Sequence, residues 1–442
     1  MFLSIAIING LYLKLFSARY EININMGQMK RTLGLFDTAL LSLGAIIGAG
    51  IFVVTGFASQ IAGPSLIFSV IIAGIVAAFT GVSASQLVKA FPIEGGEYEY
   101  AYRTLSPFLA FLSGWMWCLN KIVTDSVIAL GLATYASLFL PIHIKAIALL
   151  VIGLATAINY RGILATSKTI NLLTTIKLGI LLLFAFAGIF NVKMSNYLRF
   201  FPNGISGMFQ SAAIIFFAYV GFIRPIYVVE EVKQPERNVP KGIFLGLLIS
   251  MFVYFLVTFV AIGLVGSRSL GSTDSPLALA ISSINFPFGT QLIIFGATLA
   301  TFSVLIGDLL GLSRMLFALG RKEDLPKWLG SIEKYSQNPR NAVLFSGLAI
   351  GIPSLFFDLR GLVQVASFLI LVYFALLNFS ATRLKRNPRK FYIISIIGIL
   401  STLTLAFSLS FLNIILGGLL ILIGVTYFYV KKIIIRKTCA RF

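Results

Sequence analysis

Apolar runs, each long enough to cross a lipid bilayer, follow one another along almost the whole chain. About 30 Å of hydrocarbon needs roughly 20 apolar residues in a helix, which satisfies its own backbone groups. Hydrophobic residues make up 58% of the 442 residues and charged residues only 11%, which excludes an ordinary soluble protein. The sequence therefore predicts an all-α polytopic membrane protein. Its runs lie near residues 36–60, 65–90, 106–140, 143–160, 166–190, 207–231, 240–266, 276–319, 341–357, 361–382, 391–411 and 413–432.

The distribution of basic residues decides the predicted topology. The run at 106–140 either crosses once at a tilt or crosses twice, and two crossings would invert everything after it. With one crossing and an inside N-terminus, most lysines and arginines fall in inside segments, as the positive-inside rule requires. We therefore predict about twelve transmembrane helices in the plasma membrane, with both termini cytoplasmic. The outside segments then hold only Lys145, Lys193, Arg199, Arg268 and Arg360.

Composition also excludes several classes of function. The formal net charge is +20, but the basic residues are scattered between apolar runs, so we predict a lipid bilayer and no nucleic acid as partner. Two cysteines and one histidine supply neither a disulfide framework nor a metal site, and we expect no cofactor. Short linkers predict a single transmembrane domain over residues 30–442. Residues 1–29 precede it as an extension, which an over-extended start would explain equally well.

Two of the runs are interrupted near their centres by residues that weaken a helix. The first contains Gly48-Ala49-Gly50, three residues without bulk that let the backbone approach a ligand closely. The second contains Gly221 and Pro225, which lower helix stability and remove a hydrogen bond within one turn. Broken helices in both halves of a membrane protein are typical of a transporter binding site.

The two ends of a broken helix predict the kind of ligand. The half-helix that begins after the break presents N–H groups to an anion, and the one that ends before it presents carbonyl groups to a cation. An amino acid zwitterion matches both ends. The alternative is that Gly44 and Gly48 form only a helix-packing motif, which is common in membrane spans.

In these breaks and in further segments, the chain resembles the amino acid permeases of the amino acid-polyamine-organocation superfamily. The resemblance runs from about Arg31 to Arg436, and the motifs are specific together although each alone is weak. The matching segments are residues 44–52, residues 91–100, Gly114-Trp115, residues 216–222 with residues 230–241, and Ser313-Arg314 with Leu325-Pro326.

The resemblance implies a LeuT-type fold with discontinuous helices 1 and 6 and a site near the bilayer midplane. Two inverted repeats of five helices would occupy residues of about 36–190 and 207–382, and two extra helices would follow at about 391–432. Membership would also imply that the protein is a transporter and not an enzyme.

The resemblance further implies roles for individual residues at the breaks. The N–H groups of Ala49, Gly50 and Ile51 would bind the substrate carboxylate. Carbonyl groups would bind the ammonium group, and Phe217 would also form an aromatic gate. The predicted backbone site comprises Ile46, Gly48, Ala49, Gly50, Ile51, Phe217, Val220 and Gly221, with the carbonyl groups of Ile46, Phe217 and Val220 facing the ammonium.

Lys177, in the fifth predicted span, is the candidate for ion coupling. A lysine inside a membrane is costly and therefore a functional candidate by default. Its ammonium group can occupy a cation site and release a proton, as in proton-coupled relatives. The alternatives are a lysine that snorkels toward the surface and one held by a static cluster of carbonyl groups.

Other charged residues within the spans are candidates for side-chain recognition. The chain departs from the family at Ile223, where many members carry glutamate, and Arg224 follows it. Lys121 and Asp125 lie four residues apart, so they can neutralise each other within one helix. The alternative is a substrate subsite of mixed charge, which leaves the substrate side chain open. That predicted subsite contains Lys121, Asp125, Arg224 and Asp308.

The sequence thus predicts a secondary transporter of amino acids, driven by protons and working by alternating access. An exchanger of an amino acid for an amine or a polyamine is the closest alternative. A sensor that binds without transport is another. The oligomeric state and the direction of flux stay open.

Overall fold

A computed structural model of the chain describes residues 31–92, 96–162, 167–333, 338–385 and 388–439. Helices dominate this part, which contains no β-strand and only one bridge, between Leu33 and Val232. The all-α prediction is therefore confirmed, while the predicted extension at residues 1–29 lies outside the described residues. The first elements are α2 (Leu35–Ile46), η2 (Gly50–Val54), α3 (Thr55–Ala62), η3 (Gly63–Ser65), α4 (Leu66–Ala90), α5 (Gly96–Thr104), α6 (Pro107–Ala136), α7 (Ile144–Tyr160) and α8 (Ser167–Ile189).

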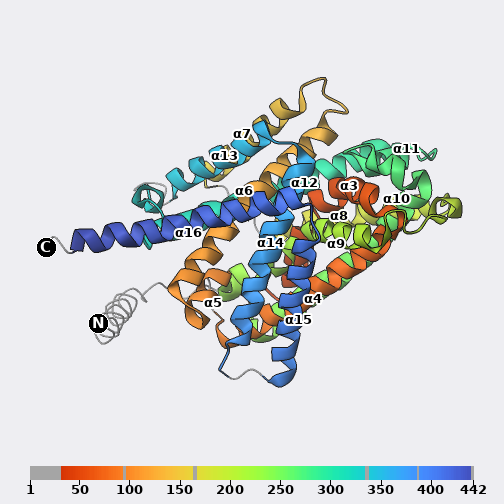
Figure 1. Ribbon diagram of the computed structural model, residues 1–442. Helices are drawn as coiled ribbons and strands as arrows, with labels where there is room; N and C mark the ends of the chain where they lie inside the picture. Colours follow the sequence, from red (N-terminus) through yellow and green to blue (C-terminus); the bar gives the residue numbers. More distant parts are fainter. Residues whose placement is uncertain (1–30, 93–95, 163–166, 334–337, 386–387, 440–442) are drawn as a thin grey trace.

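The second half of the chain continues in the same manner. Its elements are η4 (Met194–Tyr197), α9 (Gly204–Tyr219), η5 (Val220–Glu231), α10 (Pro235–Gly271), α11 (Pro276–Ser282), α12 (Gly289–Arg321), η6 (Lys327–Gly330), α13 (Arg340–Phe356), α14 (Leu359–Thr382), α15 (Arg389–Phe407) and α16 (Phe411–Cys439). Most of α6 and α14 is buried, whereas α16 lies along the outside of both (Figure 1).

Nine helical stretches in the described part are long and apolar enough to cross a membrane, which agrees with a multi-pass membrane protein. α7 and α13 are apolar but shorter. The first stretch, Leu35–Ala90, has 56 residues and contains three α-helices. Its chain turns at Gly63, whose φ of +66° is accessible to glycine at no steric cost.

The predicted runs correspond to these elements with one correction. The run at 106–140 is a single uninterrupted helix, α6, which agrees with one crossing. The run at 276–319 is not one element, because the short α11 ends at Ser282 and α12 begins only at Gly289. Apolar residues continue through the connection, so hydropathy alone joins the two helices.

Both predicted helix breaks are present. α2 ends at Ile46, Ile47 is extended, and a π-helical turn begins at Gly50. α9 ends at Tyr219 and continues as the 3-10 segment η5, which contains Pro225. The two breaks lie against each other, since a Cβ atom on Gly50 would overlap the backbone of Ala218.

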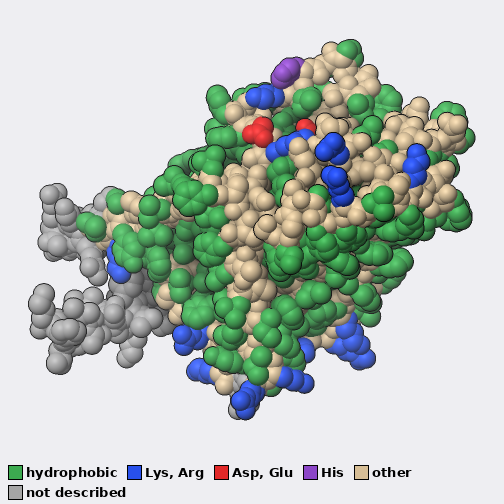
Figure 2. Space-filling model, turned by 45° about the vertical axis from the view of Figure 1, so that its right-hand side comes forward, with side chains coloured by type: hydrophobic (Ala, Val, Ile, Leu, Met, Phe, Trp, Pro, Cys, Tyr) green, Lys and Arg blue, Asp and Glu red, His purple; other side chains and the backbone are tan. Residues whose placement is uncertain are grey.

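The outside of the molecule carries a broad band of hydrophobic side chains, and lysine and arginine side chains lie on both sides of this band (Figure 2). Large apolar side chains of the apolar helices are exposed, among them Phe186 of α8, Leu248 and Phe252 of α10 and Leu348 of α13. Because water would not tolerate so much contiguous apolar surface, this band is the surface that faces lipid.

The close approach of the breaks predicts that Gly221 tolerates no larger residue. Its Cβ atom would lie 2.6 Å from the nitrogen of Ile46 and would overlap Ala45, all backbone atoms that cannot rotate away. We expect Gly221→Ala to destabilise the protein by about 1–3 kcal/mol, the usual range for overpacking. The measurement is the thermal midpoint of the purified protein in detergent.

The matched control is Gly153→Ala in α7, where nothing lies within 4 Å of the added Cβ. An equal shift of the midpoint in the two variants would contradict the close packing of the breaks.

Candidate functional site

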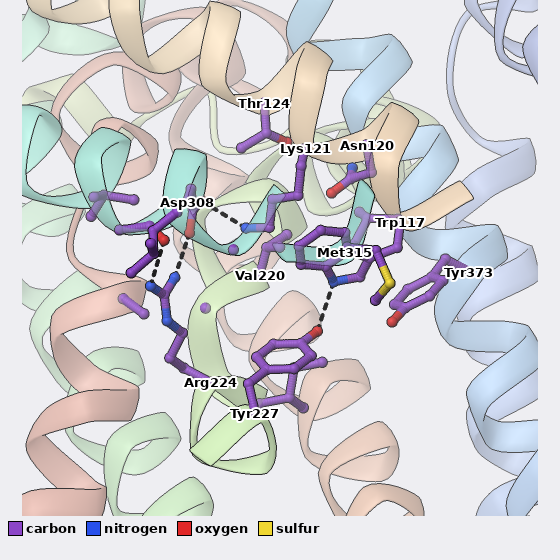
Figure 3. Close-up of a pocket in the computed structure, with 18 of the residues that line it drawn as sticks. Trp117, Asn120, Lys121, Thr124, Val220, Arg224, Tyr227, Asp308, Met315 and Tyr373 are labelled. Carbon is purple, nitrogen blue, oxygen red and sulfur yellow. Dashed lines mark hydrogen bonds and ion pairs between the residues drawn. The ribbon is translucent and has the colours of Figure 1, made fainter. Parts of the chain in front are cut away.

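A cavity of about 830 Å³ lies where the two helix breaks meet α6, α12 and α14 (Figure 3). It brings together ten of the thirteen residues predicted from sequence. The remaining three, Ile51, Asp125 and Lys177, are buried outside its lining. The ten are Ile46, Gly48, Ala49, Gly50, Lys121, Phe217, Val220, Gly221, Arg224 and Asp308.

Lys177 lies behind the first break and not at the membrane surface. Its side chain is 2% exposed, and Nζ donates hydrogen bonds to the carbonyl oxygens of Gly44, at 3.2 Å, and Ile47, at 3.3 Å. These carbonyl groups are freed where α2 ends, and an ammonium group satisfies them. The snorkelling alternative is therefore wrong, while the carbonyl cluster is present.

Tyr254 of α10 joins the two breaks and was not predicted. Its hydroxyl group contacts the carbonyl oxygens of Ile46, at 2.8 Å, and Ala218, at 3.3 Å. One phenol thus stabilises the last turn of both broken helices. The only sequence signal was a single phenol within an apolar run, which is too weak to identify a partner.

The glycines of the first break serve packing as well as the cavity. A Cβ atom on Gly44 would overlap the side chain of Thr174 in α8, so Gly44 allows α2 and α8 to approach closely. Gly48 lies against Val304 of α12 and also lines the cavity. The packing alternative therefore describes Gly44, whereas Gly48 both packs against α12 and lines the cavity.

An ionic cluster of three side chains occupies one wall of the cavity (Figure 3). Nζ of Lys121 lies 2.6 Å from Oδ2 of Asp308, and Nη1 of Arg224 lies 2.5 Å from Oδ1 of the same carboxylate. α6, η5 and α12 each contribute one member. The expected pair between Lys121 and Asp125 is wrong, because the lysine reaches across to α12 instead.

Asp125 differs from the other predicted charges. It is 0% exposed, and neither carboxyl oxygen has a hydrogen-bond partner among the described residues. Asp125 does not line the cavity, although it is close enough to Asp308, Lys121 and Arg224 to interact with their charges. Sequence spacing placed it on the same face as Lys121 but could not reveal that α12 supplies the nearer partner.

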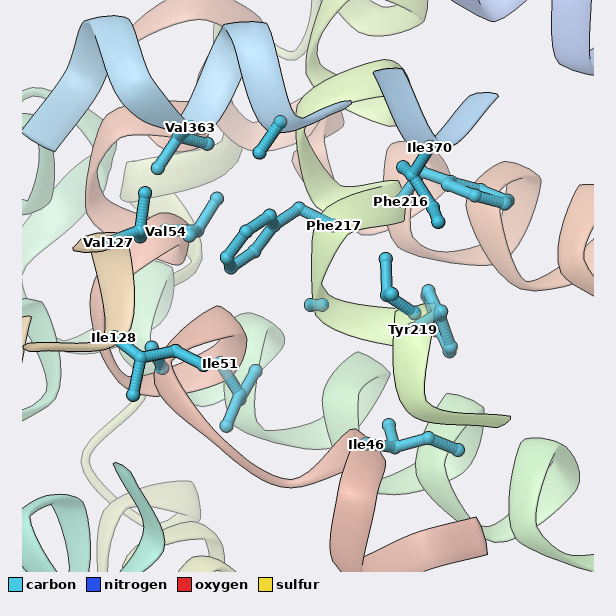
Figure 4. Close-up of a cluster of buried hydrophobic side chains, with 14 of the residues drawn as sticks. Ile46, Ile51, Val54, Val127, Ile128, Phe216, Phe217, Tyr219, Val363 and Ile370 are labelled. Atoms are coloured by element: carbon cyan, nitrogen blue, oxygen red, sulfur yellow. The ribbon is translucent and has the colours of Figure 1, made fainter. Parts of the chain in front are cut away.

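Apolar side chains close another side of the cavity. Phe217, 6% exposed, lies among Val54, Val127 and Val363, and Ile51 and Ile128 lie nearby (Figure 4). Ile51 therefore belongs to this apolar cluster, although its backbone follows the break.

An aromatic wall, not predicted, faces the ionic cluster. Nε1 of Trp117 donates to the hydroxyl oxygen of Tyr227 at 2.8 Å, and that hydroxyl donates to the carboxyl group of Glu97 at 3.0 Å. Glu97 belongs to the short helix α5, which is not among the membrane-crossing candidates. Burial raises the pKa of this carboxyl group, and the hydrogen bonds oppose that effect. Glu97 lies in the sequence motif at residues 91–100, but the sequence alone predicts no role for it.

The cavity extends to charged residues beyond the ends of the spans. Glu99 forms an ion pair with Arg103 at 2.7 Å and a longer one with Lys322 at 3.8 Å. Tyr98 donates to Asp324 at 3.0 Å, and Nζ of Lys322 lies 4.3 Å from the centre of the Tyr98 ring. These contacts attach α5 to the end of α12.

The chain is similar in sequence to a known family and to several named transporters. The family model described as amino acid permease matches residues 37–440. A branched-chain amino acid permease of Bacillus subtilis is 29% identical over 431 residues and covers 91% of this chain and 93% of the relative. A methylthioribose transporter of the same organism is 33% identical over 380 residues, with 81% and 82% covered. An uncharacterized transporter of Mycobacterium tuberculosis is 30% identical over 416 residues and covers 93% of each chain. These relatives are transporters and not enzymes.

The contacts of the Tyr254 hydroxyl with both breaks predict that its removal destabilises the folded protein. Tyr254→Phe leaves the carbonyl groups of Ile46 and Ala218 without this donor, and we expect a loss of about 1–3 kcal/mol. The thermal midpoint of the purified protein measures it.

Tyr100→Phe is the matched control, because the buried hydroxyl of Tyr100 has no partner among the described residues. We expect its midpoint to stay near that of the unmodified protein. A Tyr254→Phe midpoint equally unchanged would refute the role of Tyr254 at the breaks.

Burial of Glu97 predicts a pH dependence of stability. Its pKa is raised above the ordinary 4.5, so the folded protein holds this proton more tightly than the unfolded chain. The contribution is complete below the unfolded pKa and is lost as the pH rises through the folded pKa. Between about pH 5 and pH 8, we expect the midpoint of Glu97→Gln to fall less than that of the unmodified protein.

Glu236→Gln, at an exposed glutamate, serves as the control and is expected to follow the unmodified protein. Parallel pH curves for the unmodified protein and Glu97→Gln would show that the carboxyl group of Glu97 has no such linkage.

Proposed function

Because this chain belongs to the amino acid permease family, we propose that it is a secondary transporter of amino acids that works by alternating access. The cavity at the two helix breaks carries the proposal. Its volume falls within the range of about 300–1,000 Å³ that is usual for small-molecule sites. Backbone groups, charged side chains and aromatic rings all line it, and all are suited to a polar substrate.

The proposed arrangement has about twelve spans in a LeuT-type 5+5 inverted repeat. Two crossings by Leu35–Ala90, together with α7, α13 and the other long stretches, would supply that number. The broken pairs α2–η2 and α9–η5 would be helices 1 and 6. The charge pattern favours a plasma membrane location with both termini cytoplasmic.

The proposed substrate position uses the backbone of both breaks. The N–H groups of Ala49, Gly50 and Ile51 would bind the carboxylate, and the carbonyl groups of Phe217 and Val220 the ammonium. Tyr254 already donates to the Ile46 carbonyl, whose second lone pair would still accept from the substrate.

In this proposal, the cavity corresponds to the inward-facing state of the transporter. It extends to Glu99 and Lys322, on segments that the charge pattern assigns to the cytoplasm. Phe217 and its apolar neighbours would close the opposite path. Rocking of the broken pairs against α6 and α12 would reverse this access.

A second candidate substrate follows from the comparisons. The methylthioribose transporter is 33% identical to this chain, and its name assigns it a substrate that is not an amino acid. The panel of any transport assay should therefore include methylthioribose. If only methylthioribose is taken up, it replaces the amino acid as the proposed substrate.

The proposal assigns proton coupling to Lys177. We expect an inward proton gradient to stimulate amino acid uptake into proteoliposomes, and Lys177→Ala to abolish this stimulation because it removes the ammonium from Gly44 and Ile47. The measurement is the initial rate of uptake of labelled amino acids with and without the gradient.

Lys145→Ala, at the exposed start of α7, is the control and should keep the stimulation. Equal stimulation in Lys177→Ala would exclude this lysine from coupling. Flux only against a preloaded amino acid or amine would establish an exchanger, and binding without flux would establish a sensor.

A further inference from the structure

The ionic cluster contains two cations and one anion that reach the cavity. The side chains of Arg224 and Lys121 are 26% and 11% exposed, whereas that of Asp308 is 4% exposed. Each carboxylate oxygen of Asp308 already contacts one cation. The positive groups therefore remain more accessible from the cavity than the negative one.

The guanidinium group of Arg224 is held in place by the backbone of α12. Nη2 donates to the carbonyl oxygen of Gly307 at 2.9 Å, and a Cβ atom on Gly307 would lie only 2.7 Å from Nη2. Glycine at this position thus lets the guanidinium lie against the helix. Two of its five N–H donors bond to Asp308 and Gly307, and the others bond to no residue in the described part.

Other acids do not cancel the surplus positive charge. Asp125 reaches neither cation, because both of its oxygens lack a donor within the described part of the chain and the residue does not line the cavity. The lining also contains two acidic and two basic residues, Glu99 and Glu231 with Arg314 and Lys322, whose formal charges sum to zero.

On the basis of the proposed transport function, we propose that the substrate is an amino acid with an anionic side chain, whose second carboxylate binds Arg224 and Lys121. An anion there balances a charge that is expensive within a membrane. The carboxylate also accepts charge-assisted hydrogen bonds from the remaining N–H groups of the guanidinium.

The spacing of the site fits such a substrate. Arg224 follows Gly221 by three residues of the same 3-10 segment, and one turn of that helix rises about 6 Å. The proposed ammonium and carboxylate positions lie at the breaks, one turn away. A side chain of two or three carbons bridges this interval, whereas a cationic side chain would meet like charges.

The test compares L-glutamate with L-glutamine, which differ at the terminal group and hardly in shape. Calorimetric titration of the purified protein should give at least about tenfold tighter binding of glutamate, as expected for a charge-assisted contact. Arg224→Gln and Lys121→Gln should each reduce this ratio about tenfold. Arg340→Gln removes an arginine that pairs with Glu333 outside the cavity, and it should leave the ratio unchanged.

Two further variants keep the test decisive. Arg224→Lys retains the positive charge and should retain part of the preference for glutamate. It replaces Arg224→Gln in the test if that variant fails to fold. Asp125→Asn changes an acid that bonds to neither cation and does not line the cavity, so the ratio should not change. A higher ratio in Asp125→Asn would mean that the carboxyl group of Asp125 offsets the positive charge of the cluster, which overturns the charge count and with it the proposal.

The outcomes separate this inference from the function on which it rests. Glutamine, leucine or arginine bound as tightly as glutamate would overturn the anionic subsite and leave amino acid transport standing. If no amino acid in the panel binds or is transported, both the proposed function and the subsite are wrong.

Discussion

Backbone groups released at two helix breaks must find partners inside an apolar protein, and the arrangement of the centre follows from this requirement. An unpaired carbonyl or N–H group costs several kcal/mol where water is absent. Here the phenol of Tyr254 serves both breaks, and the ammonium of Lys177 serves the end of α2. Ser42 also donates from α2 to the carbonyl oxygen of Phe222. Partners from α8 and α10 thus fix where those helices lie.

The same requirement explains why glycines are concentrated at the breaks. Gly50 approaches Ala218, and Gly221 approaches Ala45, so the two broken segments are in backbone contact. Contact at that distance excludes side chains larger than hydrogen at Gly50 and Gly221, and both residues also line the cavity. The charged side chains of the ionic cluster then come from the neighbouring helices α6 and α12 and, in the case of Arg224, from the broken segment η5.

Sequence reasoning succeeded where the signal was local. Chain breakers at Gly48 to Gly50 and at Gly221 and Pro225 marked both breaks, because their effect on a helix does not depend on the fold. It failed where partners are distant. Lys121 and Asp308 are 187 positions apart, and nothing in the local spacing distinguishes this pair from Lys121 with Asp125. Tyr254 carried no motif, and the gap between α11 and α12 was concealed by apolar residues.

The ionic cluster joins a broken segment to two unbroken helices, and this gives it a second consequence. Arg224 belongs to η5, whereas Lys121 and Asp308 belong to α6 and α12. A ligand carboxylate bound to the remaining guanidinium donors would compete with Asp308 for the positive charge of Arg224 and would thereby weaken the bridge between η5 and α12. In the proposed transport cycle, occupation of the cavity and movement of η5 against α12 would therefore both depend on the ion pair between Arg224 and Asp308. The apolar cluster around Phe217 contains no ion pair for which a ligand could compete. A charged ligand would therefore affect the packing of the breaks through Arg224.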